Sequence, residues 1–290
     1  MSTKPRRKAL LVGIDGCNLP RIDNVAAPTL RRLRDHGYHA SSSVYPTPPD
    51  GGEPVTTVSG PGWSTILTGT WPWTHGVLDN TITGHRLEEH PDLISRATAA
   101  GLSTFYSATW KPLYDEILTR QVTDRVVIDQ DHWPEYELTV AGSTVHAITQ
   151  GVDLAFAYFG SPDQAAHRAG ATSAAYDQAI ENVDRHLSAL LRTVEARTGE
   201  DWMVLVTTDH GHRPEGGHGG QTPAERASFV LGSGGGLPTG TAPAESPPEF
   251  RMVDIAPTLL AHLGVAPAAV AAGPAAGASA GFDGVPRNGG

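Results

Sequence analysis

Asp209 and His210 bring a carboxylate and an imidazole together directly after an apolar stretch, residues 203–208. Both groups are common zinc ligands in proteins. The alternative without a metal is that the aspartate caps a helix and the histidine after it is exposed. A further histidine, His218, stands between two pairs of glycines, where the backbone can approach an ion closely. Together, these residues indicate a metal site.

A second carboxylate–imidazole pair is formed by Asp163 and His167, which are four residues apart. This spacing places both on one side of a loop or of a first helical turn, where they could hold one divalent ion. A surface pair with this spacing also arises often by chance. The single cysteine, Cys17, excludes an intrachain disulfide and is better explained as a small buried residue than as a thiolate ligand.

A candidate nucleophile, Ser59, lies just ahead of Pro61 and an expected helix over residues 61–68. Proline is favoured in the first turn of a helix. Backbone N–H groups and the helix dipole stabilise negative charge at such a position, whether on an alkoxide or on a phosphoryl oxygen. The structural alternative is that Ser59 only caps the helix.

The expected elements alternate between apolar strands and amphipathic helices. Strands are predicted at 9–14, 38–45, 103–107, 152–159, 203–208 and 228–232. Helices are predicted at 29–36, 61–68, 93–100, 134–148, 174–196 and 253–263. This alternation predicts an α/β fold with a mostly parallel central sheet and helices on both faces.

Three of these strands end next to candidate metal ligands. The strand at 9–14 is followed by Asp15, the strand at 152–159 leads to Asp163, and the strand at 203–208 is followed by Asp209. In α/β sheets, ligands bind outside the carboxyl ends of the strands. We therefore expect the three carboxylates to converge at one edge of the sheet.

The bulk composition restricts the partners and the compartment. A net charge of -10 and a pI near 5.7 argue against a nucleic-acid-binding face, although bound metal ions would still allow a small anionic substrate. The apolar run after the basic N-terminus is too short for a signal peptide, and no stretch is long enough to span a bilayer. We expect a cytoplasmic protein without membrane association, folded as a single domain over residues 1–290 with a low-complexity segment at about 266–280.

The order of the motifs resembles the alkaline phosphatase superfamily and, within it, the nucleotide pyrophosphatase/phosphodiesterase branch. The resemblance covers most of the chain. The matching segments are, in order, Asp15-Gly16, Ser59-x-Pro61 through Leu67-Thr68-Gly69, Pro72-x-Thr74-His75-Gly76-Val77, Asp79-Asn80, Asp163-x-x-x-His167, Asp209-His210-Gly211, His218-Gly219-Gly220 and Asp254 through Leu260. Each segment is modest by itself, and the ordered set is specific.

The resemblance implies an alkaline-phosphatase-like fold and two bound Zn²⁺ ions. One ion would be held by Asp163, His167 and His218. The other would be held by Asp15, Asp209 and His210, with Ser59 as its fourth ligand and as the nucleophile. Asn80 falls where the branch has an asparagine that binds a phosphoryl oxygen, and His75 belongs to a structural loop motif.

Two positions depart from the family pattern, and two assignments have rivals. Ser59 replaces the threonine that is common in the branch, and Trp63 stands where sulfatases of the superfamily carry an arginine, which argues against a sulfatase. Thr57 competes with Ser59 as the nucleophile, and the spacing to Pro61 favours Ser59. His212 competes with His218 as a zinc ligand, and the flanking glycines favour His218.

The predicted function is the hydrolysis of a phosphodiester or a nucleotide pyrophosphate, in a small phosphate-containing substrate, through a phosphoserine intermediate. The alternative is a phosphomonoesterase or phosphonate hydrolase on the same metal site. A monoester carries more charge and calls for a positioned cation, for which Lys111, Arg168 and Arg213 are the candidates. A non-enzymatic binding protein is disfavoured, because every position expected to hold a ligand is occupied.

Overall fold

The computed structural model describes residues 5–118, 121–128, 135–239, 250–266 and 281–287. Its centre is a seven-stranded sheet in the order β2-β7-β6-β1-β5-β3-β4. The strands are β1 (Arg6–Ile14), β2 (Tyr38–Ser43), β3 (Thr104–Ala108), β4 (Asp124–Val127), β5 (Leu154–Phe159), β6 (Glu200–Thr207) and β7 (Ala227–Gly234). Among these strands, β7 runs antiparallel to both of its neighbours, and the other pairings are parallel.

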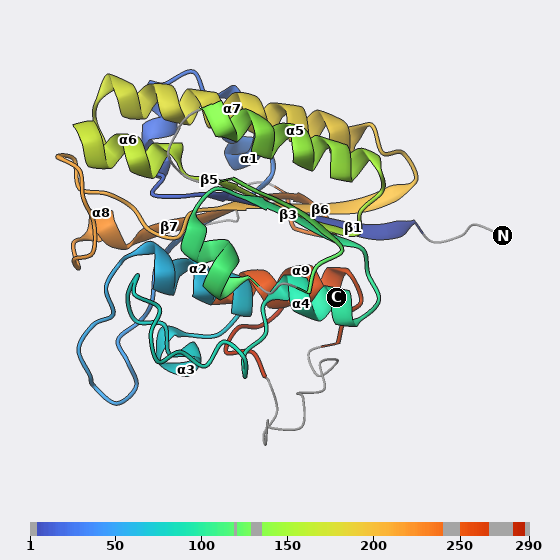
Figure 1. Ribbon diagram of the computed structural model, residues 1–290. Helices are drawn as coiled ribbons and strands as arrows, with labels where there is room; N and C mark the ends of the chain where they lie inside the picture. Colours follow the sequence, from blue (N-terminus) through green and yellow to red (C-terminus); the bar gives the residue numbers. More distant parts are fainter. Residues whose placement is uncertain (1–4, 119–120, 129–134, 240–249, 267–280, 288–290) are drawn as a thin grey trace.

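Helices cover both faces of the sheet (Figure 1). One face carries α1 (Pro28–His36), α5 (Glu135–Thr149), α6 (Ser161–Ala169) and α7 (Ala174–Glu195). The other carries α2 (Ser59–Thr68), α3 (Pro72–His75), α4 (Leu93–Ala99) and α9 (Ile255–His262). The remaining elements are the short helix α8 (Pro223–Arg226) and short helical turns at Leu19–Asn24, Leu113–Ile117 and Met252–Asp254.

The central strand β1 explains why two separate cores form. Its side chains alternate, so that Leu10 and Val12 join the core beneath α1, α5 and α7, while Leu11 joins the core beneath α2, α4 and α9. Each of these side chains is fully buried, and burying a leucine contributes roughly 1.5–3 kcal/mol. A strand buried on both faces reads as a continuous apolar run, which is the pattern seen here.

The structure confirms the predicted fold class, and the strands and helices expected from the sequence are present, with bounds that shift by a few residues. Besides the turns at Leu19–Asn24 and Leu113–Ile117, four elements were not predicted, and they are α3, α6, α8 and β4. Three of them are only four residues long, too short for a periodic pattern to emerge. The fourth, α6, begins with Ser-Pro, which resembles a turn as well as a helix start. The predicted low-complexity segment at 266–280 lies, apart from its first residue, outside the described residues.

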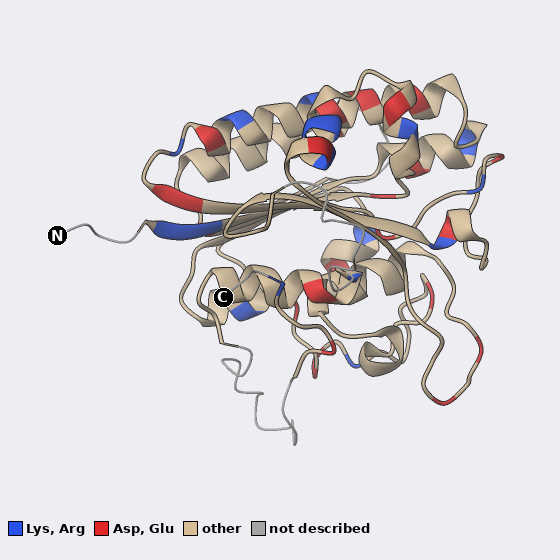
Figure 2. Cartoon of the chain, turned by 180° about the vertical axis from the view of Figure 1, so that it is seen from behind, with Lys and Arg blue, Asp and Glu red and all other residues tan. Residues whose placement is uncertain are grey.

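Charged residues lie mainly on the outer helices and loops, with both signs interspersed, while the middle of the sheet is free of them (Figure 2). None of the helices among the described residues combines the length and the apolar composition needed to cross a membrane.

Candidate metal centre and nucleophile

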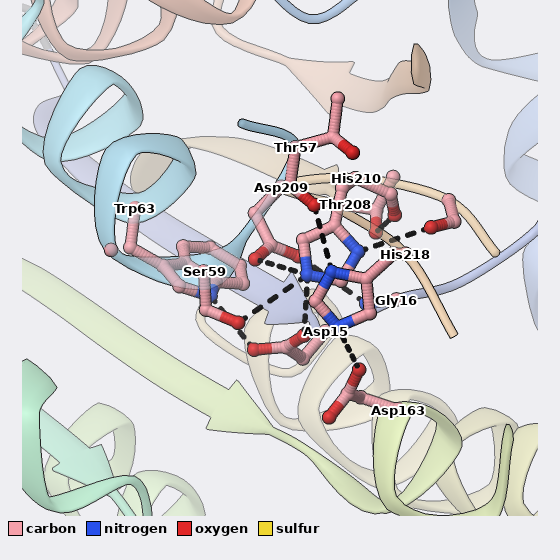
Figure 3. A network of polar contacts seen from close by, with 12 residues as sticks. Asp15, Gly16, Thr57, Ser59, Trp63, Asp163, Thr208, Asp209, His210 and His218 are labelled. Atoms are coloured by element: carbon pink, nitrogen blue, oxygen red, sulfur yellow. Dashed lines mark hydrogen bonds and ion pairs between the residues drawn. The ribbon is translucent and has the colours of Figure 1, made fainter. Parts of the chain in front are cut away.

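A first cluster of ligand-type side chains forms at the carboxyl ends of β1 and β6. Asp15 follows β1, and Asp209 and His210 follow β6, so the parallel pairing of the two strands brings them together. Their ligand atoms all lie within 4.8 Å of one another. His210 Nε2 is 3.5 Å from Asp15 Oδ1 and 3.3 Å from Asp209 Oδ2, and all three side chains are buried (Figure 3).

The electrostatics of this first cluster call for an added positive charge. Burial, reinforced by the nearby Asp163 carboxylate, raises the pKa of Asp15 to about 7. Burial and the Asp15 carboxylate raise the pKa of Asp209 well above its ordinary value, and burial lowers the pKa of His210. Asp15 Oδ1 and Asp209 Oδ2 are buried and have no hydrogen-bond partner among the described residues. Two unpartnered carboxylate oxygens beside an imidazole fit a divalent cation.

A second cluster lies beside the first and combines α6 with the loop after β6. Asp163 and His167 are four residues apart on α6, so they lie on one face of that helix. Asp163 Oδ1 is 2.9 Å from Nε2 of His212, and it is 3.3 Å from Nε2 of both His167 and His218. Burial alone would raise the pKa of Asp163, but hydrogen bonds from these three imidazoles lower it well below its ordinary value.

The structure brings both rivals, His212 and His218, to Asp163, so the preferred His218 is in the cluster and His212 joins it. His212 is fully buried, and its Nε2 lies 2.6 Å from the position that a Cβ on residue 16 would occupy. Residue 16 must therefore be glycine for His212 to reach the cluster. The Asp15-Gly16 pair in the family motif was the signal in the sequence. The motif does not indicate that the glycine makes room for His212.

The structure gives Thr57 a different task from that of Ser59. The Thr57 hydroxyl donates to the Gly220 carbonyl and accepts from the Gly219 N–H, both at 2.9 Å. Its hydrogen-bonding capacity is therefore used in holding the glycine loop around His218. Ser59 is the first residue of α2, and its Oγ lies 3.3 Å from His210 Nε2 (Figure 3). Of the two hydroxyls, only that of Ser59 contacts a residue of the metal clusters.

Small residues let the start of α2 approach the site. A Cβ on Gly62 would lie 2.8 Å from Asp209 Cβ, so a larger residue would separate the helix from the first cluster. A Cβ on Gly60 would lie 2.5 Å from the backbone oxygen of Asp79. The glycines therefore fix the distance between the Ser59 end of the helix and the carboxylates of the sheet.

Asn80 lies at the rim of the site and contacts the helix start directly. Its side-chain oxygen accepts a hydrogen bond of 2.7 Å from the Gly60 N–H. The sequence predicted that Asn80 binds a phosphoryl oxygen, and in the structure one atom of its side chain holds the start of α2. Because the oxygen of the Asn80 side chain is used in this hydrogen bond, its amide nitrogen is the atom that can donate to a phosphoryl group.

The remaining sequence candidates lie outside the two clusters. Burial raises the pKa of the Cys17 thiol to about 12, as expected for a packed core residue. Lys111 pairs with Asp115, Arg213 lies 3.7 Å from Glu225, and Arg168 is exposed on α6.

Comparisons with known proteins agree with this geometry. Residues 9–220 match the family model described as type I phosphodiesterase / nucleotide pyrophosphatase. Mouse ectonucleotide pyrophosphatase/phosphodiesterase family member 7 is 26% identical over 227 residues, which is 71% of this chain and 50% of that protein. The chain thus spans about half the length of this curated relative.

Solved structures show the same fold. Human ectonucleotide pyrophosphatase/phosphodiesterase 5 superposes with a TM-score of 0.70 at 14% identity, covering 90% of this chain and 96% of that one. An inactive variant of the murine protein, solved in complex with AMP, has a TM-score of 0.53 at 21% identity and covers 71% of this chain and 57% of that one. The family indicated by the ordered motifs is confirmed: the chain belongs to the type I phosphodiesterase / nucleotide pyrophosphatase family.

Proposed function

We propose that the protein hydrolyses phosphodiester or pyrophosphate bonds in small phosphate-containing molecules, with Ser59 as the nucleophile and two Zn²⁺ ions as cofactors. One observation carries the proposal. Ser59, at the start of α2, contacts His210 of the first cluster, and the second cluster lies directly beside the first. A hydroxyl next to two ligand clusters is the arrangement used in two-metal phosphoryl transfer.

The donor sets suit zinc. Asp163, His167 and His218, with His212 close to Asp163, would hold one ion, and Asp15, Asp209, His210 and Ser59 would hold the other. These are oxygen and nitrogen donors, and imidazole nitrogens, which favour zinc over magnesium or calcium, are prominent among them. When bound, the ions would lower the pKa of a nearby hydroxyl and balance the negative charge of a phosphoryl group.

The protein's own residues then account for the remaining chemistry. Ser59 Oγ attacks phosphorus, an Oγ–P bond forms, and the bond from phosphorus to the leaving oxygen breaks, while the proton lost by Ser59 passes through solvent to the leaving oxygen. Water then cleaves the Oγ–P bond, which restores the Ser59 hydroxyl and releases the phosphoryl product. The positive end of the α2 helix dipole and the amide nitrogen of Asn80 stabilise the negative charge that develops on the phosphoryl oxygens.

The charge of the site favours a diester over a monoester. A phosphomonoester carries an additional negative charge, and two of the three candidate cations have carboxylate neighbours of their own: Lys111 pairs with Asp115, and Arg213 lies 3.7 Å from Glu225. The murine relative that was solved with AMP supports a nucleotide as one part of the substrate. A phosphomonoesterase or phosphonate hydrolase remains the second candidate, favoured by the exposed Arg168 on α6, the helix that carries Asp163.

The test compares turnover of bis-p-nitrophenyl phosphate with turnover of p-nitrophenyl phosphate, with metal content measured on the same preparation. We expect two zinc ions per chain, a preference for the diester, and a loss of the diester activity in Asn80→Ala. A preference for the monoester would replace this proposal with the second candidate. Fewer than two ions per chain in a zinc-saturated preparation would contradict the two-metal mechanism.

The predicted cytoplasmic location becomes part of the same proposal. Fractionation of the native host, with detection of the untagged protein, tests it. Recovery in the cytoplasmic fraction is expected, and recovery in the medium or in the membrane fraction would contradict it.

A further inference from the structure

The two oxygens of the Asp15 carboxylate lie in different surroundings. Oδ2 accepts a hydrogen bond of 2.6 Å from the Tyr158 hydroxyl and one of 2.9 Å from the indole N–H of Trp63. Oδ1 has no hydrogen-bond partner among the described residues and lies 3.5 Å from His210 Nε2. One oxygen is therefore tied to the protein while the other faces the candidate metal site (Figure 3).

We propose that Trp63 is a positioning residue, which fixes Asp15 relative to Ser59 by a hydrogen bond from the nucleophile's own helix. The inference rests on the proposed function, because it concerns the same site. It assigns to this tryptophan a role that the motif comparison did not give it, since that comparison used Trp63 only to argue against a sulfatase.

The contacts around Trp63 connect four residues in a closed cycle. Ser59 and Trp63 are four residues apart on α2, so both side chains lie on one face of the helix. Ser59 Oγ contacts His210, His210 approaches Asp15 Oδ1, and the other oxygen of Asp15 returns to Trp63. Any rotation of the Asp15 carboxylate, or any movement of α2 along the sheet, breaks at least one of these contacts.

Residues of the sheet leave room for the indole ring of Trp63 and pack against it. A Cβ on Gly13 would lie 2.4 Å from Cη2 of Trp63, so the ring fits only because β1 has a glycine there. The ring meets Tyr158 edge-on, with centroids 5.4 Å apart at 74°, and lies 6.1 Å from Phe156. Trp63 is fully buried, so an unpaired indole N–H would be costly at this position.

Hydrogen bonds to a ligating carboxylate orient it and tune its affinity for metal. Losing such a partner typically costs about 10–100-fold in metal affinity or activity. A residue that merely fills the core would leave metal affinity unchanged once its shape is kept. The two roles therefore predict different results for a replacement that removes the N–H group alone.

The experiment replaces Trp63 with 3-benzothienylalanine, which keeps the shape of the indole but has sulfur in place of the N–H. Trp63→Phe is made in parallel, and the matched control is the same replacement at Trp202, whose N–H donates to Glu200 on β6 at the opposite end of the strand from Asp209. The readouts are the two metal affinities from chelator competition with Zn²⁺ and Co²⁺, the Co²⁺ absorption spectrum, and kcat and KM on the diester.

We expect the Trp63 replacement to weaken one of the two bound ions by about 10–100-fold and to leave the other unchanged. The Co²⁺ spectrum of the weakened site should change, and kcat should fall more than KM rises. Gly13→Ala, which pushes the ring away from Asp15, should weaken the same ion. Unchanged affinities, spectrum and kcat in the benzothienylalanine protein would overturn the inference and leave Trp63 as a core residue.

The failure of this inference differs from the failure of the proposed function. A wild-type protein that binds two ions but turns over no phosphate ester would contradict the function, while the metal affinities would still test Trp63. A wild-type protein that hydrolyses the diester, together with a variant whose metal affinities are unchanged, would contradict only the role of Trp63.

Discussion

The backbone oxygen of Thr57 lies 2.7 Å from Nδ1 of His218, and this contact determines which ring nitrogen of His218 points into the site. Nδ1 donates its proton to the carbonyl, so Nε2 is left as the atom that points toward Asp163, 3.3 Å away. Orientation of a ligating histidine through its second nitrogen is a recurrent feature of metal sites. Thr57, a rival for the nucleophile in the sequence, is thus a partner of the metal site.

This relationship predicts the effect of removing the Thr57 hydroxyl, which holds the backbone of Gly219 and Gly220. Thr57→Val keeps the size of the side chain and should weaken metal binding at the Asp163 cluster by about 10-fold or more. Thr57→Ser keeps the hydroxyl and should bind metal like the wild type. Chelator competition measures both. Equal affinities in Thr57→Val and the wild type would show that the loop is held by other contacts.

The nucleophile assignment predicts a different pattern for Ser59. Ser59→Ala should lower kcat by more than about 1,000-fold, because the attacking atom is lost, while the Asp163 cluster keeps its ion. Ser59→Thr should retain measurable turnover, because it supplies the same hydroxyl.

The matched control for Ser59 is Ser64→Ala, a buried serine on the same helix whose hydroxyl has no hydrogen-bond partner among the described residues and which should keep normal turnover. Wild-type turnover in Ser59→Ala would remove Ser59 from the mechanism. Trapping a phosphorylated peptide and finding the phosphate on another residue would do the same.

The positions of the candidate ligands that directly follow strands could be predicted from the sequence. Asp15 and Asp209 follow apolar runs, and a parallel sheet necessarily brings the carboxyl ends of neighbouring strands together. Asp163 was placed correctly near that edge, although the helix carrying it was not predicted. The fold class followed from the same alternation of strands and helices.

The residues that orient these ligands could not be found in this way. Trp63, Tyr158 and Glu137 read as ordinary core or helix positions, because their partners are 24 to 143 residues away in the chain. Long-range hydrogen bonds leave no periodic trace in a sequence. The approach of His212 to Asp163 could not be predicted either, since it depends on the missing Cβ of Gly16.

Glu137 on α5 holds the start of α6, the helix that carries Asp163 and His167. Its carboxylate accepts hydrogen bonds from the Ser161 N–H at 2.8 Å and from the Ser161 hydroxyl at 2.7 Å. Burial raises the pKa of Glu137 from 4.5 to about 7, against the opposing effect of these hydrogen bonds. The folded state therefore binds more protons than the unfolded state between these values.

It follows that Glu137 makes the free energy of unfolding fall as the pH rises from about 4.5 to about 7, by up to about 3 kcal/mol. Glu137→Gln cannot ionise, so it should lack this contribution. The difference in stability between wild type and variant should favour the wild type more at pH 5 than at pH 8. Denaturant unfolding at several pH values measures it, and a difference that does not vary with pH would contradict the assignment.

His75 contributes to stability with the opposite dependence on pH. Its Nδ1 accepts from the Val77 N–H, so Nε2 carries the proton and donates to Thr65 Oγ1, which in turn donates to the Pro61 carbonyl of α2. This chain of bonds joins the turn after α3 to the helix that begins with Ser59. Burial is the main reason why the pKa of His75 falls from 6.5 to about 3.

Because the folded state holds His75 neutral, the unfolded state binds more protons between pH 6.5 and pH 3. The stabilisation is complete above pH 6.5 and is lost as the pH falls toward 3. His75→Asn should cost about 1–3 kcal/mol at pH 7.5, since it leaves buried partners unpaired. The cost should shrink steadily below pH 6.5, because the wild type then loses a stabilisation that the variant never had. Thermal and denaturant unfolding from pH 7.5 to pH 4 would detect the change, and a constant cost over that range would show that His75 is not held neutral in the fold.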